Sequence, residues 1–190
     1  MTMLRSQTVF IAGSIAISRL QPAVCERIAS VVERDMAVVV GDADGADTAI
    51  QRVLADHEAR SVTVYCSGDE PRNNVGGWPV ENIYPDAPPG TRRWFTAKDI
   101  AMAEAADYGL MIWDSRSTGT LTNVIELLGQ TKTSVVFVNK ASEFLTISDL
   151  DGLDRLVAVM SISAREKAEQ KMRLSERIGA LRHRQGALAF

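Results

Sequence analysis

Short, continuous apolar runs alternate along the chain with segments in which apolar residues recur every three or four positions. A continuous run is typical of a strand buried on both faces, whereas the wider spacing is typical of a helix with one buried face. Strands are predicted at 8–12, 37–40, 61–66, 108–113 and 134–138. Helices are predicted at 20–36, 46–58, 96–106 and 121–130.

This alternation predicts an α/β fold of the Rossmann-like, doubly wound type. We expect a mainly parallel sheet of five strands, or slightly more, with helices on both faces, formed by residues 1–140. In such sheets ligands bind outside the carboxyl ends of the strands, near the point where the strand order reverses. The loops that follow the strands are therefore the places to look for a site.

One internal segment departs from the pattern. Between residues 67 and 93 the chain has four glycines and five of its six prolines. A loop of this length in a compact domain is typical of a functional or a disordered segment. If it is functional, we expect it to close over a ligand.

The pattern of apolar residues over 141–190 predicts a C-terminal helical extension, with one helix at 147–160 and a long helix at 164–188. An apolar strip along the long helix consists of Leu174, Ile178, Leu181 and Leu188. Such a strip must be covered by the body of the same chain or by another subunit. We favour a contact in a homo-oligomer over docking on the same chain.

Composition and charge narrow the class of protein. Of the 190 residues, 46% are hydrophobic and 24% are charged, which is an ordinary globular balance. No apolar run approaches the length of a membrane span, and the two cysteines have no paired spacing. We expect reduced thiols and a cytoplasmic protein with no membrane association.

The net charge of −3 is unevenly distributed. Residues 161–190 contain seven Lys or Arg and three Asp or Glu, which leaves this segment at +4 and the rest of the chain at −7. A basic tail can contact nucleic acid, but a solvated helix face is the more ordinary interpretation. An acidic body argues against nucleic acid as a partner.

Two of the loops that follow predicted strands carry glycine with polar residues. Gly13 and Ser14 follow the first strand, where glycine permits close approach of a ligand and serine adds a hydroxyl. The second loop carries two glycines and two candidate carboxylates, namely Gly41, Asp42, Gly45 and Asp47. A single acidic residue here can simply favour the start of a helix, but with Asp44 the loop has three carboxylates within six positions, which suggests partners for ribose hydroxyls. The glycine position does not match an EF-hand, and we expect no metal site.

The third loop, 114–120, lies between a strongly predicted strand and a strongly predicted helix. Its hydroxyls and its glycine are supplied by Ser117, Thr118, Gly119 and Thr120. The following helix directs free N–H groups and its dipole at this loop, which makes a ready anion site. An ordinary helix cap needs only one of these residues, so the loop is interpreted as a phosphate cradle.

Neither the GxGxxG nor the GxxxxGK[ST] phosphate-binding motif is present. The chain nevertheless resembles the SLOG superfamily, nucleotide-binding Rossmann-like proteins that include the DprA-like and Lonely Guy families. The resemblance spans about residues 8–139 and is carried by GS at 13–14, GDADGAD at 41–47, KDIAMAEAADYGLMIWD at 98–114 and STGT at 117–120. It implies a nucleotide-like ligand.

The same resemblance limits what can be said about catalysis. The Lonely Guy enzymes carry PGGxGTxxE, whereas here residues 115–117 replace the PGG and Asn123 stands in place of the glutamate. Lys98-Asp99 stands where relatives often have an Arg-Asn pair. The phosphate-binding part of the resemblance is kept, with Asn123 counted among the ligand-binding candidates, and phosphoribohydrolase activity is not carried over.

Three functions follow as hypotheses. The first is a module that binds a nucleotide or a nucleotide-derived ligand and needs no cofactor. The second is a nucleotide N-glycosidic hydrolase or transferase, with Asp99 and Asp114 as catalytic carboxylates and Lys98 or Arg93 on the phosphate. The third, a nucleic-acid-binding protein, ranks last because the body of the chain is acidic.

Overall fold

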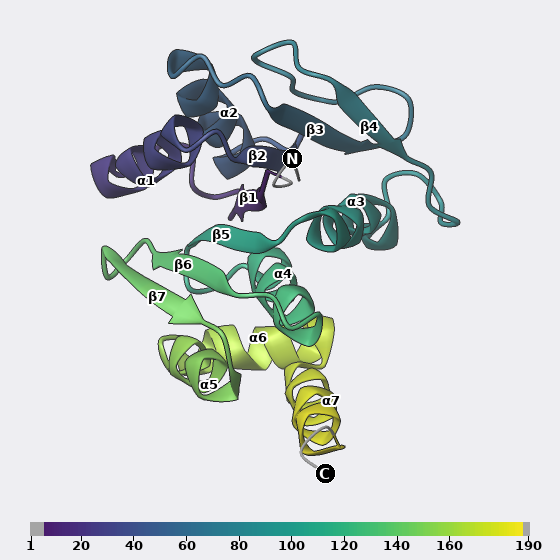
Figure 1. Cartoon of the computed structure of the whole chain (residues 1–190). Helices are drawn as coiled ribbons and strands as arrows, with labels where there is room; N and C mark the ends of the chain where they lie inside the picture. Colours follow the sequence, from purple (N-terminus) through teal and green to yellow (C-terminus); the bar gives the residue numbers. More distant parts are fainter. Residues whose placement is uncertain (1–5, 188–190) are drawn as a thin grey trace.

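The computed structural model of the chain describes residues 6–187. Within this range seven strands form one sheet, in the order β4-β3-β2-β1-β5-β6-β7 (Figure 1). Neighbouring strands are parallel except for β7, which runs antiparallel to β6. The strands are β1 Thr8–Gly13, β2 Ala37–Gly41, β3 Val62–Ser67, β4 Val80–Ile83, β5 Tyr108–Trp113, β6 Ser134–Val138 and β7 Glu143–Ile147.

Helices cover both faces of the sheet, as a doubly wound fold requires. Figure 1 shows α1 and α2 on one side of the strands and α3 and α4 on the other. The helices are α1 Pro22–Glu33, α2 Ala46–Asp56, α3 Arg92–Ala105, α4 Thr118–Gly129, α5 Leu150–Ala158, α6 Ile162–Met172 and α7 Leu174–Ala187. The predicted Rossmann-like α/β fold with C-terminal helices is confirmed.

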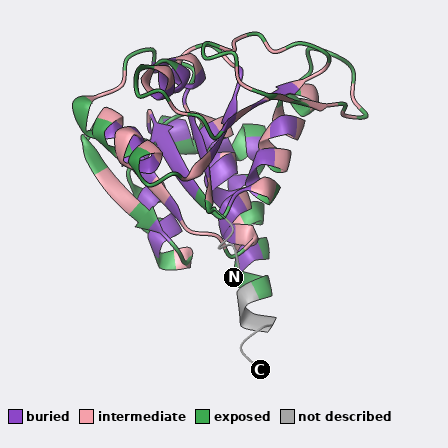
Figure 2. Ribbon diagram, turned by 45° about the horizontal axis from the view of Figure 1, so that its top comes forward, coloured by how far each residue is buried: buried purple, intermediate pink, exposed green. Residues whose placement is uncertain are grey.

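Two cores flank the sheet because successive residues of a strand point to opposite faces. In β1, Val9 and Ile11 face the core under α1 and α2, whereas Phe10 and Ala12 face the core that contains α3 and α4. All four side chains are buried, which is why the run reads as continuously apolar. Figure 2 shows the buried strands enclosed by helices whose outer faces are partly or fully exposed.

The segment 67–93 is more regular than its glycines and prolines suggest. Residues Val80–Ile83 form β4, which pairs in parallel with β3 at the edge of the sheet. Helix α3 already begins at Arg92, where the Thr91 side chain accepts a hydrogen bond from the Trp94 amide. The prediction that α3 begins at residue 96 was therefore four residues late.

The helix predicted at 147–160 was wrong at its start. Residues Glu143–Ile147 form β7, whose last residue, Ile147, is fully buried. Helix α5 begins only at Leu150, where Asp149 accepts a hydrogen bond from the Gly152 amide at 2.7 Å. The sheet therefore continues past residue 140, into the segment predicted to be a helical extension.

The single helix predicted at 164–188 is two helices. Arg173 adopts a left-handed backbone, with φ 55°, and separates α6 from α7. This break turns the apolar strip toward the body of the chain, where Leu174, Ile178 and Leu181 pack into the core that contains α4. Leu188, the fourth residue of the predicted strip, lies outside the described residues.

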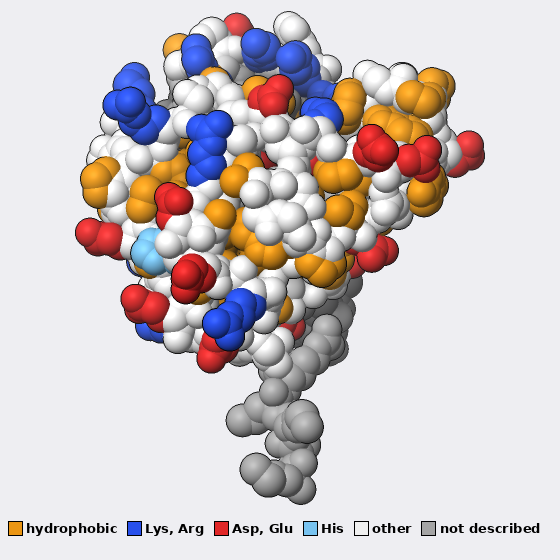
Figure 3. All heavy atoms as spheres, turned by 90° about the horizontal axis from the view of Figure 1, so that it is seen from above, with side chains coloured by type: hydrophobic (Ala, Val, Ile, Leu, Met, Phe, Trp, Pro, Cys, Tyr) orange, Lys and Arg blue, Asp and Glu red, His pale blue; other side chains and the backbone are white. Residues whose placement is uncertain are grey.

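The surface mixes charged and apolar side chains. Figure 3, which views the molecule from the side of α2, β3 and β4, shows acidic and basic side chains interspersed with apolar ones. None of the helices within residues 6–187 is both long enough and apolar enough to cross a membrane.

Candidate functional site

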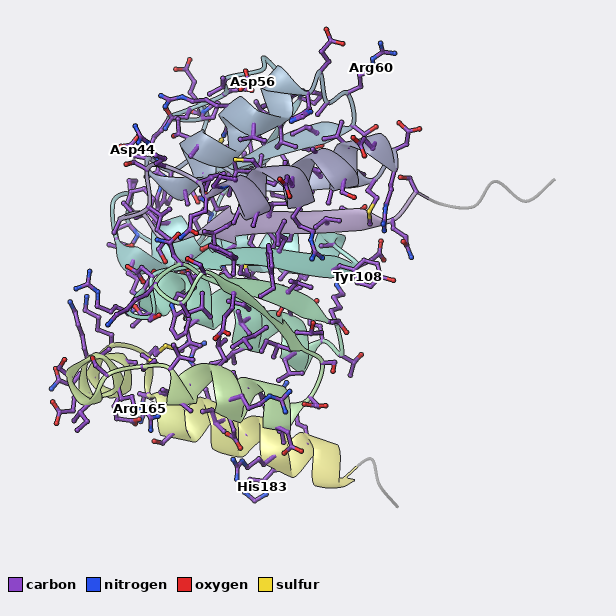
Figure 4. The ribbon with its side chains drawn as sticks, turned by 90° about the vertical axis from the view of Figure 1, so that its left-hand side faces the viewer. Asp44, Asp56, Arg60, Tyr108, Arg165 and His183 are labelled. Atoms are coloured by element: carbon purple, nitrogen blue, oxygen red, sulfur yellow. The ribbon has the colours of Figure 1, made fainter. Side chains whose placement is uncertain are left out.

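The strand order reverses between β1 and β5, which lie side by side although α1, α2 and α3 separate them in sequence. The carboxyl ends of these strands bring the loop after Gly13 against the loop after Trp113. Figure 4 shows Asp44 at this end of the sheet and Tyr108, the first residue of β5, at the other end. A doubly wound fold places its ligand at such a reversal.

A chain of hydroxyl groups joins the two loops. The Ser14 hydroxyl accepts a hydrogen bond from the Asp114 amide at 3.1 Å and lies 3.2 Å from the Thr120 hydroxyl. Thr120 in turn donates to the Ser117 hydroxyl at 3.3 Å. Ser14 and Thr120 are buried, so these two predicted residues hold the loops together from below.

Asp114 holds the turn into α4. One of its carboxylate oxygens accepts from the amides of Arg116 at 2.9 Å and Ser117 at 2.6 Å. Ser115, which lies between Asp114 and Arg116, has φ 65°. The Trp113 indole donates a hydrogen bond to the Ser117 carbonyl at 3.0 Å. These bonds place the first turn of α4, so the structure gives Asp114 a role in positioning.

The first turn of α4 presents unpaired backbone donors. The first amide to find an acceptor within the helix is that of Leu121, which donates to the Ser117 carbonyl, and the Ser117 side chain makes no capping hydrogen bond. The amides of Thr118, Gly119 and Thr120 therefore have no acceptor within the helix. A side chain at position 119 would meet nothing closer than the Ser117 hydroxyl, 3.9 Å away, so a ligand can approach this backbone closely.

An open groove of about 660 Å³ lies next to this turn. Its walls come from the loop after β1, the loop after β5 and one face of α6, and it includes Ile15, Asp114, Ser117 and Thr118. Gly45 supports the first wall, because any side chain there would collide with the Ile15 backbone. Gly13 is also a packing position, since a side chain would meet Ala46 and the Ile112 carbonyl at 2.7 Å.

Several cations near the groove were not predicted. Arg116, Lys167 and Lys171 line it, and the Arg92 guanidinium lies 3.5 Å from the Thr118 hydroxyl. The predicted cation of this segment, Arg93, is exposed and is not among the residues that line the groove. The sequence did contain a signal for two of these cations. Lys167 and Lys171 are four residues apart in the basic tail, and that spacing places them on one helix face.

A second group of predicted residues forms a buried ionic cluster around Lys98. The Lys98 ammonium lies 3.3 Å from Asp99, 3.6 Å from Asp42 and 3.9 Å from Asp47. Gly41 makes room for it, since a side chain there would collide with the Asp47 carboxylate and the Lys98 ammonium. Within residues 6–187 no group of His, Cys, Asp or Glu is arranged to hold a metal ion. The three carboxylates surround an ammonium.

Arg72, from the segment predicted as a loop, covers the cluster. Its guanidinium donates to both carboxylate oxygens of Asp42, at 2.8 and 3.1 Å, and its amide donates to the same carboxylate at 3.0 Å. The guanidinium also stacks over the Phe95 ring at 4.8 Å. Asp42 is thus paired with both Lys98 and Arg72, and the sequence could not show the second partner because it lies 30 residues away.

Burial and pairing shift the pKa values of the cluster in opposite directions. Burial would raise the pKa of Asp42, but the hydrogen bonds from Arg72 and the charge of Lys98 hold it below its ordinary value. Burial raises the pKa of Asp47 to about 6, against the opposing charge of Lys98. Burial likewise raises the pKa of Asp99. Burial would lower the pKa of Lys98, but the three surrounding carboxylates raise it.

The predicted site residues therefore separate into two groups. One group, at the α4 end, contains Ser14, Asp114 and the stretch 117–120, and its members Asp114, Ser117 and Thr118 line an open groove. The other contains Asp42, Asp47, Lys98 and Asp99, which bind one another. Asn123 is buried within α4, one turn after the cradle.

Comparison with known proteins gives no relative from which a function can be transferred. No protein-family model, no curated protein and no solved structure matches the chain. Function must therefore be argued from the site itself.

Proposed function

We propose that the chain binds a phosphate-bearing, nucleotide-like ligand in the groove at the start of α4. The observation that carries the proposal is the trio of backbone amides at 118–120, which have no acceptor within their helix and lie at the reversal of the strand order. Helix N-termini favour anions through both their free N–H groups and their dipole. The resemblance to the SLOG superfamily supports the same ligand class.

The proposed pose follows from what borders the amides. A phosphate accepts from the amides at 118–120 and from the hydroxyl of Thr118, which lines the groove. The sugar or base lies against Ile15 and Ala16, on the opposite wall. Asp42 and Asp47 are not assigned to ribose hydroxyls, because Arg72 and Lys98 already engage them.

Thermal unfolding with matched ligands tests this proposal. A ligand that binds only the folded state at about 100 times its Kd stabilises it by about 2.7 kcal/mol. AMP, NAD and ADP-ribose should raise the melting temperature, whereas adenosine, which has the same base and ribose but no phosphate, should not. The proposal is overturned if none of the phosphate-bearing compounds raises the melting temperature, or if adenosine raises it equally.

A second candidate function, hydrolysis of an N-glycosidic bond, is favoured by one observation. Asp99 keeps 21% of its side chain exposed beside the Lys98 ammonium, and burial of its carboxyl raises the pKa. In its protonated form such a carboxyl can donate its proton to a departing base, and it regains a proton from the water that adds to the anomeric carbon. Release of free base from AMP, abolished in Asp99→Asn, supports this function, and a wild-type protein that releases none excludes it.

A further inference from the structure

Helix α6 presents two faces with different contacts. Ala164, Ala168 and Met172, spaced by four residues, are buried in the core. The neighbouring face carries Ser163, Lys167 and Lys171 with the same spacing, and all three line the groove. Figure 4 shows Arg165 of α6 on the same side of the molecule as Asp44, which marks the carboxyl end of the sheet. The C-terminal segment thus completes a groove that the sheet alone would leave open.

Positive charge gathers here on a protein whose net charge is negative. Arg116, Lys167 and Lys171 line the groove together with one carboxylate, that of Asp114. Within residues 6–187, none of these three cations forms an ion pair with a carboxylate, and neither does Arg92. The mutual repulsion of such cations is relieved when an anion binds among them.

Arg92 ties the three helices around this charge. Its guanidinium donates to the Lys171 carbonyl at 2.8 Å and to the Thr118 hydroxyl at 3.5 Å. A side chain from α3 thus joins the end of α6 to the start of α4. The lysines of α6 and the amides of α4 therefore border the same groove from different elements.

We infer that Lys167 and Lys171 form a second phosphate subsite, and that the ligand is a nucleoside diphosphate or a derivative with two adjacent phosphates. The inference rests on the proposed function and extends it. The amides of α4 take one phosphate, and the lysine pair takes the next. The groove, at about 660 Å³, is large enough for a small nucleotide rather than a lone anion.

Isothermal titration with AMP, ADP and inorganic pyrophosphate tests the subsite. Because a hydrogen bond to a charged group contributes about 1.5–3 kcal/mol, wild-type protein should bind ADP roughly tenfold or more tightly than AMP. In the double variant Lys167→Ala, Lys171→Ala this preference should fall to about twofold, while AMP affinity changes little. Both lysines are exposed, so the fold should persist.

The matched control is Arg52→Ala, Arg60→Ala, which removes two exposed cations elsewhere that form no ion pair within the described residues. This variant should keep the wild-type preference for ADP. Equal binding of AMP and ADP by wild type, or a preference that survives loss of both lysines, overturns the subsite and leaves the proposed function standing.

Binding of pyrophosphate distinguishes the second phosphate subsite from the proposed binding of a nucleotide. If pyrophosphate binds in a manner that depends on both lysines while nucleotides bind no better, the subsite is supported and the nucleotide proposal fails. If none of the three probes binds at millimolar concentration, both the subsite and the proposed function are overturned.

Discussion

At the scale of single residues, the sequence identified which residue types gather at the strand ends but not what they contact. Asp42, Asp47, Lys98 and Asp99 were predicted as site residues, and they do lie together. Their charges are paired with one another. Arg72, which covers them, comes from a segment without a regular pattern of apolar residues. Residue spacing cannot show such pairing, because it depends on distances between elements far apart in sequence.

Asp47 should give the protein a distinctive dependence on pH. Its folded pKa of about 6 exceeds the ordinary value of 3.8, so between these values the folded state holds a proton that the unfolded state releases. The stability contributed by this proton is present at low pH and is lost as pH rises toward 6. From pH 7 to pH 5, wild type should gain roughly 1 kcal/mol relative to Asp47→Asn.

Urea unfolding at both pH values measures this difference. Asp42 and Asp99 remain in both proteins, so the difference between the two profiles reports the titration of Asp47 together with its coupling to these neighbours. Parallel pH profiles for the two proteins would show that Asp47 titrates normally.

Gly119 should matter for binding but not for folding. Apart from its chain neighbours and the backbone of its own helix, a methyl group at this position meets nothing closer than the Ser117 hydroxyl at 3.9 Å, and alanine is favoured over glycine in a helix by about 1 kcal/mol. Gly119→Ala should therefore fold at least as stably as wild type. Its affinity for AMP should drop about tenfold, since the methyl group crowds the amides that receive the phosphate.

Chemical denaturation and AMP titration of the same preparation check both halves of this prediction. An equally exposed change outside the groove, Gly179→Ala, provides the control because its methyl group also meets open space. Unchanged AMP affinity in Gly119→Ala would place the phosphate elsewhere.

At the scale of helices and strands, the strength of the pattern decided what could be predicted. The strands β5 and β6 were predicted with their observed bounds, because each has a neighbouring strand on both sides and is almost entirely apolar. The strands β4 and β7 were missed, since each is a short edge strand in which most residues are half-exposed or exposed. The break at Arg173 was missed because arginine carries no sequence signal for a left-handed backbone.

That break supplies a prediction about α6 and α7. Arg173 has φ 55°, a conformation that costs an L-residue about 1–2 kcal/mol and that glycine adopts freely. Arg173→Gly should increase the free energy of unfolding by about 0.5–1 kcal/mol, after allowance for the greater freedom of glycine in the unfolded chain.

Arg173→Ala separates the backbone effect from loss of the exposed ion pair with Glu176. It should be no more stable than wild type in urea, because alanine keeps the left-handed strain. A glycine variant less stable than the alanine variant would refute this interpretation of the break.

At the scale of the whole molecule, the sequence correctly predicted the doubly wound sheet, and for the apolar strip of the C-terminal segment it favoured a homo-oligomer contact over docking on the same chain. The apolar strip that suggested a homo-oligomer packs, in its described part, on the same chain. This packing turns the other face of α6 toward the groove. Such an arrangement depends on how α6 and α7 fold back, which local periodicity does not encode.

Leu181 tests where the strip is buried. Its side chain is 5% exposed in the single chain, so Leu181→Ala should cost about 2–4 kcal/mol through lost burial and the cavity left behind. The cost should be the same at low and high protein concentration, since the contact lies within one chain. A cost that grows with protein concentration would instead assign the strip to an oligomer interface.

The central claim is that the amides at the start of α4 receive a phosphate. A titration of ¹⁵N-labelled protein with ADP, followed by amide chemical shifts, observes those groups individually. We predict that the chemical shifts of the Thr118, Gly119 and Thr120 amides change most and saturate together, and that adenosine leaves them unchanged. Saturable shifts elsewhere that spare these three amides, or no shifts at all, would contradict it.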